Sequence, residues 1–320
     1  MPDLAPIQNA LRIIGQRPDD IIGPHTAHVL ADGSNLLSSQ SLPGISLVAH
    51  AIEGRIAVEL RIAEEHQAES PIHLCFGLFK PNGVQTVSLD LTLCPNAKAT
   101  IWSHCLFSQA NQATHQMNAR IHIEAGANLD YQEVHYHGAS GAIKVLPQAT
   151  VIVGARARFR SDFTLIQGKV GLLAIDYDVD VKEDGLAELT SKVYGSGQDV
   201  IRIQERIHLN GRNARGLIKT RLAVRDHASA EVRGATFGNA AGARGHVDCT
   251  EIVRDSAVVS AIPEIKVTNS QAKVTHEASI GSVDAKQLET LMARGIDPDS
   301  AVDFIIRGML TEHQRPKVLG

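Results

Sequence analysis

Residues 214–281 read ARGLIKTRLAVRDHASAEVRGATFGNAAGARGHVDCTEIVRDSAVVSAIPEIKVTNSQAKVTHEASIG, and one small residue returns along this stretch at a nearly fixed interval. The recurring residues are Ala214, Ala228, Ala243, Ala257 and Ala272. They are separated by 14, 15, 14 and 15 residues, so every second one follows after 29. Recurrence at one spacing indicates stacked, similar units.

Each of these alanines is followed by a segment in which small or apolar residues occupy alternate positions. The first segment places Gly216, Ile218, Thr220 and Leu222 in this way. Alternation with a period of two is typical of a β-strand. Two strands in each unit of 29 residues predict a flattened coil of strands. We therefore expect an all-β fold with a parallel β-helix at its core.

The composition fits such a fold and excludes some functions. Of the 320 residues, 43% are hydrophobic and 21% are charged, as in a soluble globular protein. Only 4% are aromatic, with Trp102 as the single tryptophan, and a narrow interior filled by small aliphatic residues would have this bias. The net charge of −4 argues against a nucleic-acid partner.

Compartment and redox state follow from signals near the N-terminus and from the cysteines. The first 20 residues lack a basic segment followed by an apolar run, so we expect no signal peptide. No stretch approaches the roughly 20 apolar residues that span a membrane. The four cysteines form no CxxC pair, and reduced thiols are the simpler interpretation. A cytoplasmic protein without a membrane partner is expected.

By pattern, the chain divides into three segments. Residues 1–44 are weakly patterned, and we expect one short helix followed by irregular chain. Residues 45–281 form the β-helix core, with a repeat that is clear only after about residue 205 and is extrapolated before it. Residues 282–320 change to the spacing of apolar residues that is typical of helices.

Two short helices are expected in this last segment. Ser282 is placed to cap the first helix, which would end at Gly295. Asp297 would cap the second helix, with Pro298 as its first residue and Gly308 as its end. Packed against the last strands, the two helices would close the open edge of the β-helix and present a surface to a partner.

Cys249 and His276 fall on inward-facing positions of strands that lie one full turn apart. Neighbouring strands are about 4.8 Å apart and residues rise about 3.3 Å each, so the two Cα atoms would be about 8 Å apart. Their thiolate and imidazole could bind one soft metal ion or one cluster iron. On spacing alone, the favoured interpretation is a buried cysteine and a hydrogen-bonded core histidine without a metal ion. Glu277 directly follows His276 and should point the opposite way.

A second candidate metal site is formed by Glu133, His135 and His137, which alternate on one face of a strand. His122 and Glu124 show the same spacing nearby, and two such strands side by side would suffice to bind a metal ion. The alternative is a solvated polar face, on which carboxylates and histidines are common.

Several enzymatic motifs are missing from the sequence. It contains no GxxxxGK[ST] phosphate loop, no GxGxxG dinucleotide motif after a strand and no GxSxG nucleophile elbow. No catalytic residue is assigned, and any ATP hydrolysis would have to come from a partner chain.

The last hundred residues resemble the SufB/SufD family, the scaffold subunits of the SUF iron–sulfur cluster assembly machinery. The resemblance covers about residues 120–310 and rests on GRNARGLIK at 211–219, IPEIKVTNSQAKVTHEASIG at 262–281, and the segments 292–296 and 301–308. It implies a right-handed parallel β-helix, dimerisation through its end, and docking of a SufC-like ABC ATPase on the C-terminal helices. It also implies assembly of a transient iron–sulfur cluster.

Site residues can be carried over from this resemblance one by one. The family's His-Glu pair falls on His276 and Glu277, which makes the chain SufB-like there. A family cysteine in a T-Q-C-D context matches Cys249. Two other family cysteines fall on Ala257 and near His135, where this chain has no thiol.

The hypothesis from the sequence is therefore a non-enzymatic scaffold for cluster assembly. Its expected partners are a SufC-like ATPase, a second copy of the chain or a SufD-like chain, a sulfur donor protein and apo-protein clients. Two alternatives remain open: a SufD-like accessory protein that holds no cluster, and a β-helix carbohydrate-active enzyme with paired carboxylates in a groove.

Overall fold

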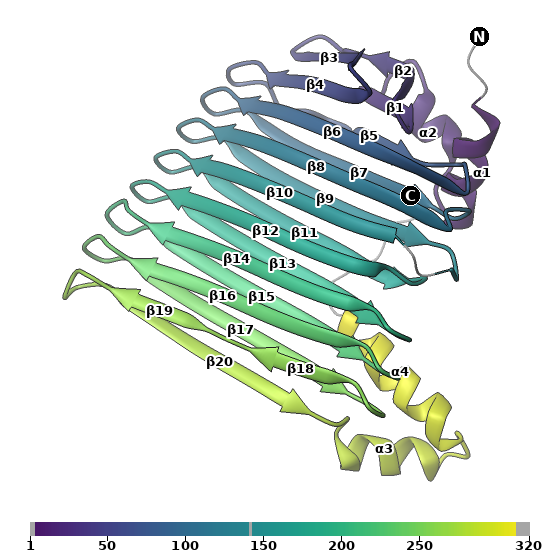
Figure 1. Cartoon of the computed structure of the whole chain (residues 1–320). Coiled ribbons are helices and arrows are strands. Elements are labelled where there is room, and N and C mark those ends of the chain that lie inside the picture. Colours follow the sequence, from purple (N-terminus) through teal and green to yellow (C-terminus); the bar gives the residue numbers. More distant parts are fainter. Residues whose placement is uncertain (1–3, 141–142, 312–320) are drawn as a thin grey trace.

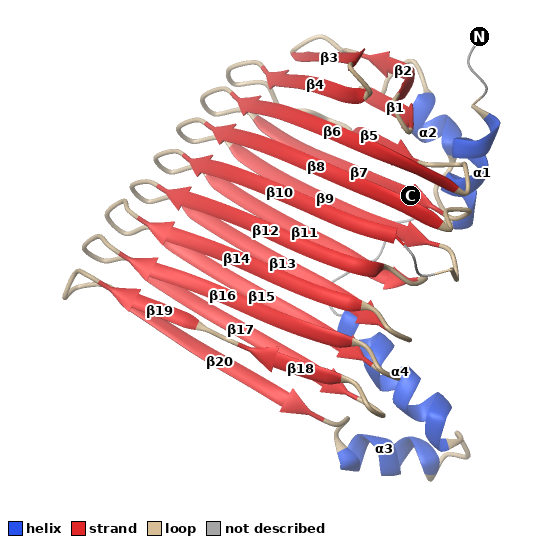
Figure 2. Cartoon of the chain, in the orientation of Figure 1, coloured by secondary structure: helices blue, strands red, loops and turns tan. Residues whose placement is uncertain are grey.

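The computed structural model describes residues 4–140 and 143–311 of the chain. Within these residues the strands form two ten-stranded sheets that face each other across a narrow interior, as Figure 1 shows. Short helices lie only at the two ends of the coil (Figure 2). The prediction of an all-β fold with a parallel β-helix core is confirmed.

From β4 to β18, consecutive strands alternate between the two sheets, which we call sheet A and sheet B. In spatial order sheet A contains β2 (Asn35–Gln40), β1 (His28–Asp32), β5 (Ile72–Gly77), β7 (Lys98–Phe107), β9 (Asn128–His137), β11 (Arg158–Gln167), β13 (Leu186–Gly195), β15 (Arg215–Val224), β17 (Arg244–Val253) and β20 (Lys273–Gly281). Sheet B contains β18 (Val258–Ala261), β16 (Ser229–Gly238), β14 (Val200–Leu209), β12 (Gly171–Val181), β10 (Ile143–Val153), β8 (Gln112–Ile123), β6 (Asn82–Leu93), β4 (Arg55–Ile62) and β3 (Ile45–Ile52), and β19 (Glu264–Val267) also pairs with β16.

The register reproduces the repeat seen in the sequence. Arg215 lies opposite Arg244, and Arg244 lies opposite Lys273, so each turn advances the chain by 29 residues. Each recurring alanine directly precedes a strand, for example Ala214 before β15. Similar spacings of 28 to 30 residues continue along sheet A as far as β5, where His73 lies opposite Trp102 on β7. The extrapolation to the part before residue 205 is therefore correct.

Alternate residues of each strand fill the interior between the sheets. Ile218, Val247 and Leu189 are almost fully buried there. Side chains at the same register position of adjacent parallel strands face the same side, so like residues stack from turn to turn. Burial of these aliphatic side chains provides the main stabilisation of the coil.

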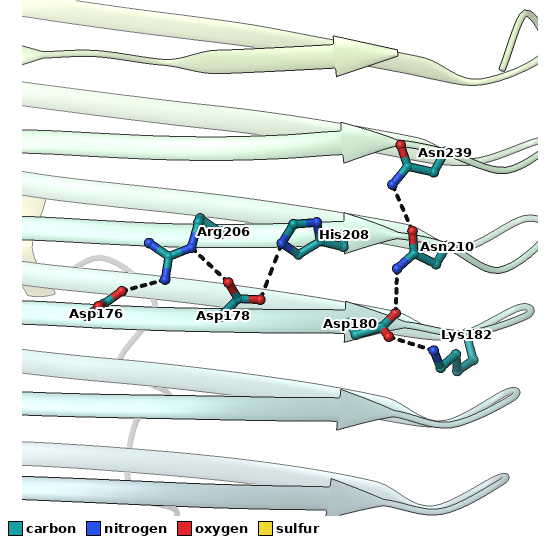
Figure 3. Close-up of polar contacts among 8 residues, drawn as sticks. All are labelled: Asp176, Asp178, Asp180, Lys182, Arg206, His208, Asn210 and Asn239. Atoms are coloured by element: carbon teal, nitrogen blue, oxygen red, sulfur yellow. Dashed lines mark hydrogen bonds and ion pairs between the residues drawn. The ribbon is translucent and has the colours of Figure 1, made fainter. Parts of the chain in front are cut away.

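On the outer surface, polar side chains form ladders that follow the turns. Figure 3 shows one on sheet B: Asn239 donates to the Oδ1 of Asn210 at 2.7 Å, and Asn210 donates to Asp180 at 2.9 Å. Lys182 completes this ladder by donating to Asp180 at 2.5 Å. Because the two asparagine contacts each link successive turns, the ladder favours the observed register over a shifted one.

The N-terminal end of the coil is finished by antiparallel strands and helices. β1 pairs with β2, and β3 pairs with β4, both antiparallel. The helices α1 (Ala5–Ile13) and α2 (Pro18–Ile22) lie beside this end, and α1 buries Ile7 and Leu11. Strands thus already occur within residues 28–40, in the segment where irregular chain was expected. The inward-facing Ile45 and Leu47 of the edge strand β3 are only 4% exposed.

The C-terminal helices differ from the prediction in their bounds. Asp284, not Ser282, caps α3 (Ala285–Met292) by accepting the backbone N–H of Gln287 at 2.8 Å. Pro298 does begin α4 (Pro298–Thr311), but this helix continues through Gly308. The expectation that the second C-terminal helix ends at Gly308 is wrong, because a single glycine weakens a helix without breaking it.

The position of α4 also differs from the prediction. Its apolar residues pack on Ala223 and Ile252, at the outer face of sheet A, and Asp299 pairs with Arg254 at 2.8 Å. Figure 1 shows α4 beside the ends of β15 and β17 rather than across the last strands. The helices therefore do not close the edge of the β-helix as expected.

The last strands form an open edge. β18 and β19 are separated by Ile262 and Pro263, and a proline has no N–H to donate to a neighbouring strand. Val258 is 65% exposed, and Ile280 of β20 is 47% exposed. None of the described helices is long and apolar enough to cross a membrane.

Candidate functional site

The open edge carries the first group of predicted site residues. Cys249 lies on β17 and His276 on the edge strand β20, and these two strands are hydrogen-bonded neighbours. His276 lies opposite Val247, whose side chain fills the interior, so Cys249 and His276 share the inward side as predicted. Cys249 is buried, whereas His276 is exposed because no further turn covers β20 among the described residues.

Glu277 faces the other side of the same strand. It lies opposite Asp248, which is bound on the outer face by Arg221 at 2.6 Å. The expectation that Glu277 points away from His276 therefore agrees with the register. Within one chain, the His276 imidazole and the Glu277 carboxylate therefore lie on opposite sides of β20, and both are exposed.

A carboxylate that the sequence interpretation missed lies between these groups. Glu251 is two residues after Cys249, on the same inward side, and it lies opposite Ile280 of β20. It is 1% exposed, and neither of its carboxylate oxygens has a hydrogen-bond partner among the described residues. Burial raises the pKa of Glu251 to about 7. The alternation after Ala243 could have revealed it, because position eight faces inward like position six.

The thiol of Cys249 is held in its neutral form by its surroundings. Burial is the main cause that raises the pKa of Cys249 to about 12, and the nearby charge of Glu251 acts in the same direction. A positive ion would reverse this preference, because a metal ion stabilises the thiolate. The edge thus offers a thiol, a carboxyl group and an imidazole on one side of two adjacent strands. Ala257, which follows the next turn of the chain, packs partly buried against the core.

The second predicted group lies deep in the interior, not on a solvated face. Glu133, His135 and His137 are each 2% exposed. The Nε2 of His135 lies 2.7 Å from Glu133, and the Nδ1 of His135 lies 3.4 Å from the Nε2 of His137. Burial raises the pKa of Glu133 to about 8 and lowers the pKa values of His135 and His137 to about 3. At neutral pH the contact is therefore a hydrogen bond between neutral groups.

The expected neighbours His122 and Glu124 do not join this group. His122 is exposed on the outer face of β8, which belongs to the other sheet. Instead, Cys105 on β7 lies directly opposite His135, and His115 reaches the interior from β8. The sulfur of Cys105 is 3.6 Å from the Nε2 of His115. The register could have revealed Cys105, since it precedes His135 by 30 residues, which is one turn.

Fold and site together define a class of protein. This is a parallel β-solenoid whose reactive side chains are thiol, imidazole and carboxyl groups, the ligands of iron, zinc and related ions. They gather at an open edge and in a closed interior, and none of them adjoins a nucleotide-binding motif. Side chains of these three kinds are able to bind metal ions or clusters.

Comparison with known proteins identifies the family. Residues 80–309 match the SufBD core domain of the SUF system for FeS cluster assembly. The chain belongs to the SufBD family.

Several archaeal relatives share almost the whole chain. An iron–sulfur cluster assembly SufBD family protein of Methanocaldococcus jannaschii is 35% identical over 308 residues, which cover 96% of this chain and 98% of the relative. A SufBD family protein of Pyrococcus horikoshii is 29% identical over 293 residues, covering 92% and 89% of the two chains. A shorter match, 33% identical over 105 residues, covers 32% of this chain and 22% of a SufBD family protein of Synechocystis.

Proposed function

We propose that this chain is a scaffold on which a transient iron–sulfur cluster is assembled at the open edge of the β-helix. Iron and sulfide are the cargo, and Cys249, Glu251 and His276 are the ligands that receive them. The observation that carries the proposal is the uncovered edge itself, where the exposed His276 of β20 lies on the same inward side as the buried Cys249 and Glu251 of the neighbouring strand β17. A sulfur donor protein would supply the sulfide, and apo-proteins of the cytoplasm would accept the finished cluster.

A second copy of the chain is the proposed cover of this edge. Val258, Val267 and Ile280 are exposed apolar side chains along the last strands, and such an edge associates readily with another strand edge. Two copies related by a two-fold axis would bring two sets of edge ligands together. In such a dimer Glu277 of one copy can serve the site of the other, although it faces away from His276 in its own chain.

The C-terminal helices are the proposed docking surface for a SufC-like ATPase. α4 is fixed by its apolar face and by Arg254, which donates to Asp299 at 2.8 Å. It nevertheless leaves Phe304 63% exposed, and Met292 at the end of α3 is also exposed. A large exposed aromatic ring on a firmly attached helix is a typical anchor for a protein partner. ATP hydrolysis on this partner would open the dimer edge for cluster transfer.

Anaerobic reconstitution with ferrous iron and sulfide tests the scaffold proposal. The wild-type chain should develop sulfide-to-iron charge-transfer absorption, and His276→Ala, Glu277→Ala and Cys249→Ser should each weaken it. His227→Ala is the matched control, because this exposed histidine lies in a turn away from the edge. Equal cluster content in the three edge variants and the control would refute the ligand assignment.

The SufD-like accessory role is favoured by one feature of the sequence resemblance, in which Ala257 takes the place of a SufB-type cysteine. In that case the chain would co-purify with the ATPase but bind no iron after reconstitution. The carbohydrate-active alternative has less support from the surface. Asp176 and Asp178 form the most evident carboxylate pair on the outer face, and Arg206 binds both, at 2.6 and 2.8 Å (Figure 3). A screen for glycan hydrolysis separates this alternative from the others.

A further inference from the structure

Four metal-binding side chains converge inside the coil, far along the chain from the open edge. Cys105, His115 and one ring nitrogen of His135 have ligand atoms that all lie within 4.8 Å of one another. His137 adjoins this group through its contact with His135. All four side chains are buried, and they come from three successive strands, β7, β8 and β9.

Two measured distances match the edges of a tetrahedral zinc-type site. Metal–sulfur and metal–nitrogen bonds of about 2.3 and 2.05 Å give a sulfur–nitrogen edge of about 3.5 Å and a nitrogen–nitrogen edge of about 3.3 Å. The sulfur of Cys105 lies 3.6 Å from the Nε2 of His115, and the Nδ1 of His135 lies 3.4 Å from the Nε2 of His137. The second distance is long for a direct hydrogen bond between two ring nitrogens.

In His135 and His137, one ring nitrogen already contacts an oxygen atom, as is usual for histidines that bind a metal ion through the other nitrogen. Such histidines usually donate the second ring N–H to a carboxylate or a backbone carbonyl. Glu133 lies 2.7 Å from the Nε2 of His135, and the backbone carbonyl of Lys169 lies 3.1 Å from the Nδ1 of His137. The remaining nitrogens, the Nδ1 of His135 and the Nε2 of His137, face each other at 3.4 Å.

His115 supplies an independent sign that the group is incomplete. It is fully buried, and its Nδ1 has no hydrogen-bond partner among the described residues. Its ring lies beside Phe107, whose centroid is 5.0 Å away, so packing fixes its position. A buried imidazole with an unpaired nitrogen is costly unless another bond of the ring compensates.

We propose that the interior of this β-helix holds one resident divalent ion of the zinc or ferrous class, bound by Cys105, His115, His135 and His137. His137 completes the four ligands after a shift of its ring toward Cys105. On binding, the Cys105 thiol and the Glu133 carboxyl group each release a proton to the solvent, and the resulting thiolate and carboxylate balance the charge of the ion. The ion is distinct from the cluster proposed at the open edge, and the interior walls imply that it is captured as the chain folds.

Cobalt substitution tests this proposal. The protein is produced in zinc-depleted medium with added Co²⁺, purified, and examined by elemental analysis and absorption spectroscopy. The expected result is one cobalt per chain with a thiolate-to-cobalt charge-transfer band. Cys105→Ser should remove the band, His115→Ala should lower the cobalt content at least tenfold, and Glu133→Gln should weaken binding by about tenfold or more.

Two control variants separate this site from other thiols and from the proposed function. Cys75 is equally buried and lies 3.5 Å from His104, but on the outer side of the sheet. Cys75→Ser should therefore keep the band. The double variant Cys249→Ser with His276→Ala should also keep it, even though cluster assembly fails. A band that persists in Cys105→Ser, or one that disappears in the double variant, would overturn the proposal.

A second measurement covers the case in which the interior variants do not fold. X-ray absorption of the zinc-loaded Cys249→Ser/His276→Ala protein should show one sulfur and about three nitrogen neighbours around the metal. A metal-free protein after growth with zinc, or a shell of oxygen atoms alone, would contradict the interior site.

Discussion

The two ends of the β-helix are built in opposite ways. At the N-terminal end the inward-facing Leu47 of edge strand β3 is 4% exposed, because antiparallel strands complete the coil there. At the C-terminal end the inward-facing Ile280 of edge strand β20 is 47% exposed. Both ends have the same kind of residue in the same orientation. Among the described residues, the interior is therefore closed at the N-terminal end and left uncovered at the C-terminal end, where a further strand could pair with β20.

Truncation of one inward-facing residue at each end gives the largest expected difference. Leu47→Ala removes a buried side chain and should lower the free energy of unfolding by about 2–5 kcal/mol. Ile280→Ala at the open edge should cost only about 0.5 kcal/mol in dilute, monomeric protein, because its side chain is half exposed there. Urea unfolding of both variants at low protein concentration measures the two values. Equal losses would mean that the C-terminal edge is already covered within one chain.

The closed part of the interior should also respond to pH. Glu205 is buried, accepts a hydrogen bond from Ser191 at 2.7 Å, and has its pKa raised by burial to about 7. The folded chain therefore keeps a proton that the unfolded chain releases. Glu205 contributes about 3 kcal/mol to the free energy of unfolding below about pH 4.5, the pKa of an unfolded glutamate. This contribution is lost as the pH rises through about 7, the pKa in the folded chain.

Glu205→Gln should remove this part of the pH dependence, as measured by urea unfolding at pH 5 and pH 8. Ser191→Ala should raise the Glu205 pKa further, because the Ser191 hydroxyl is the group that lowers it. The decrease in the free energy of unfolding should then continue to higher pH. An unchanged pH profile in Glu205→Gln would show that this carboxyl group is hydrated in the folded chain.

Charge at the two edges should affect association differently. Ile280→Lys places an ammonium group on the proposed dimer edge and should weaken the dimer by about 2 kcal/mol, or about 30-fold in its dissociation constant. Val48→Lys adds the same charge to the outer face of β3, where Val48 is comparably exposed, and should leave association unchanged. Sedimentation over a range of concentrations measures both. Equal weakening would place the dimer contact elsewhere.

The smallest expected effect concerns the helices at the two ends. Asp284→Ala removes the carboxylate that caps α3 and should destabilise this helix by about 1 kcal/mol, which is about fivefold faster amide exchange. Leu4, the residue before α1, makes no side-chain capping bond, so Leu4→Ser should not accelerate exchange in α1. Exchange in α3 that stays slow would mean that packing rather than the cap fixes this helix.

The sequence predicts the coil well because its information is local and repeated. The alanine landmarks mark each turn, and alternation then assigns Cys249 and His276 to the inward side. It predicts the ends poorly, since residues 28–40 carry no repeat and the site of α4 depends on contacts with Ala223 and Ile252. Alternation alone also cannot tell which sheet a strand joins. For this reason His122 was grouped with His135, while Cys105, one turn away, was missed.

Backbone hydrogen exchange along β20 tests the central claim most directly, because this strand has a free edge in the single chain. We expect β20 amides to exchange quickly in dilute protein and to slow markedly as a dimer forms, and Ile280→Lys should restore fast exchange. Fast exchange in β20 while the protein sediments as a dimer would contradict the claim that a second copy completes the open edge.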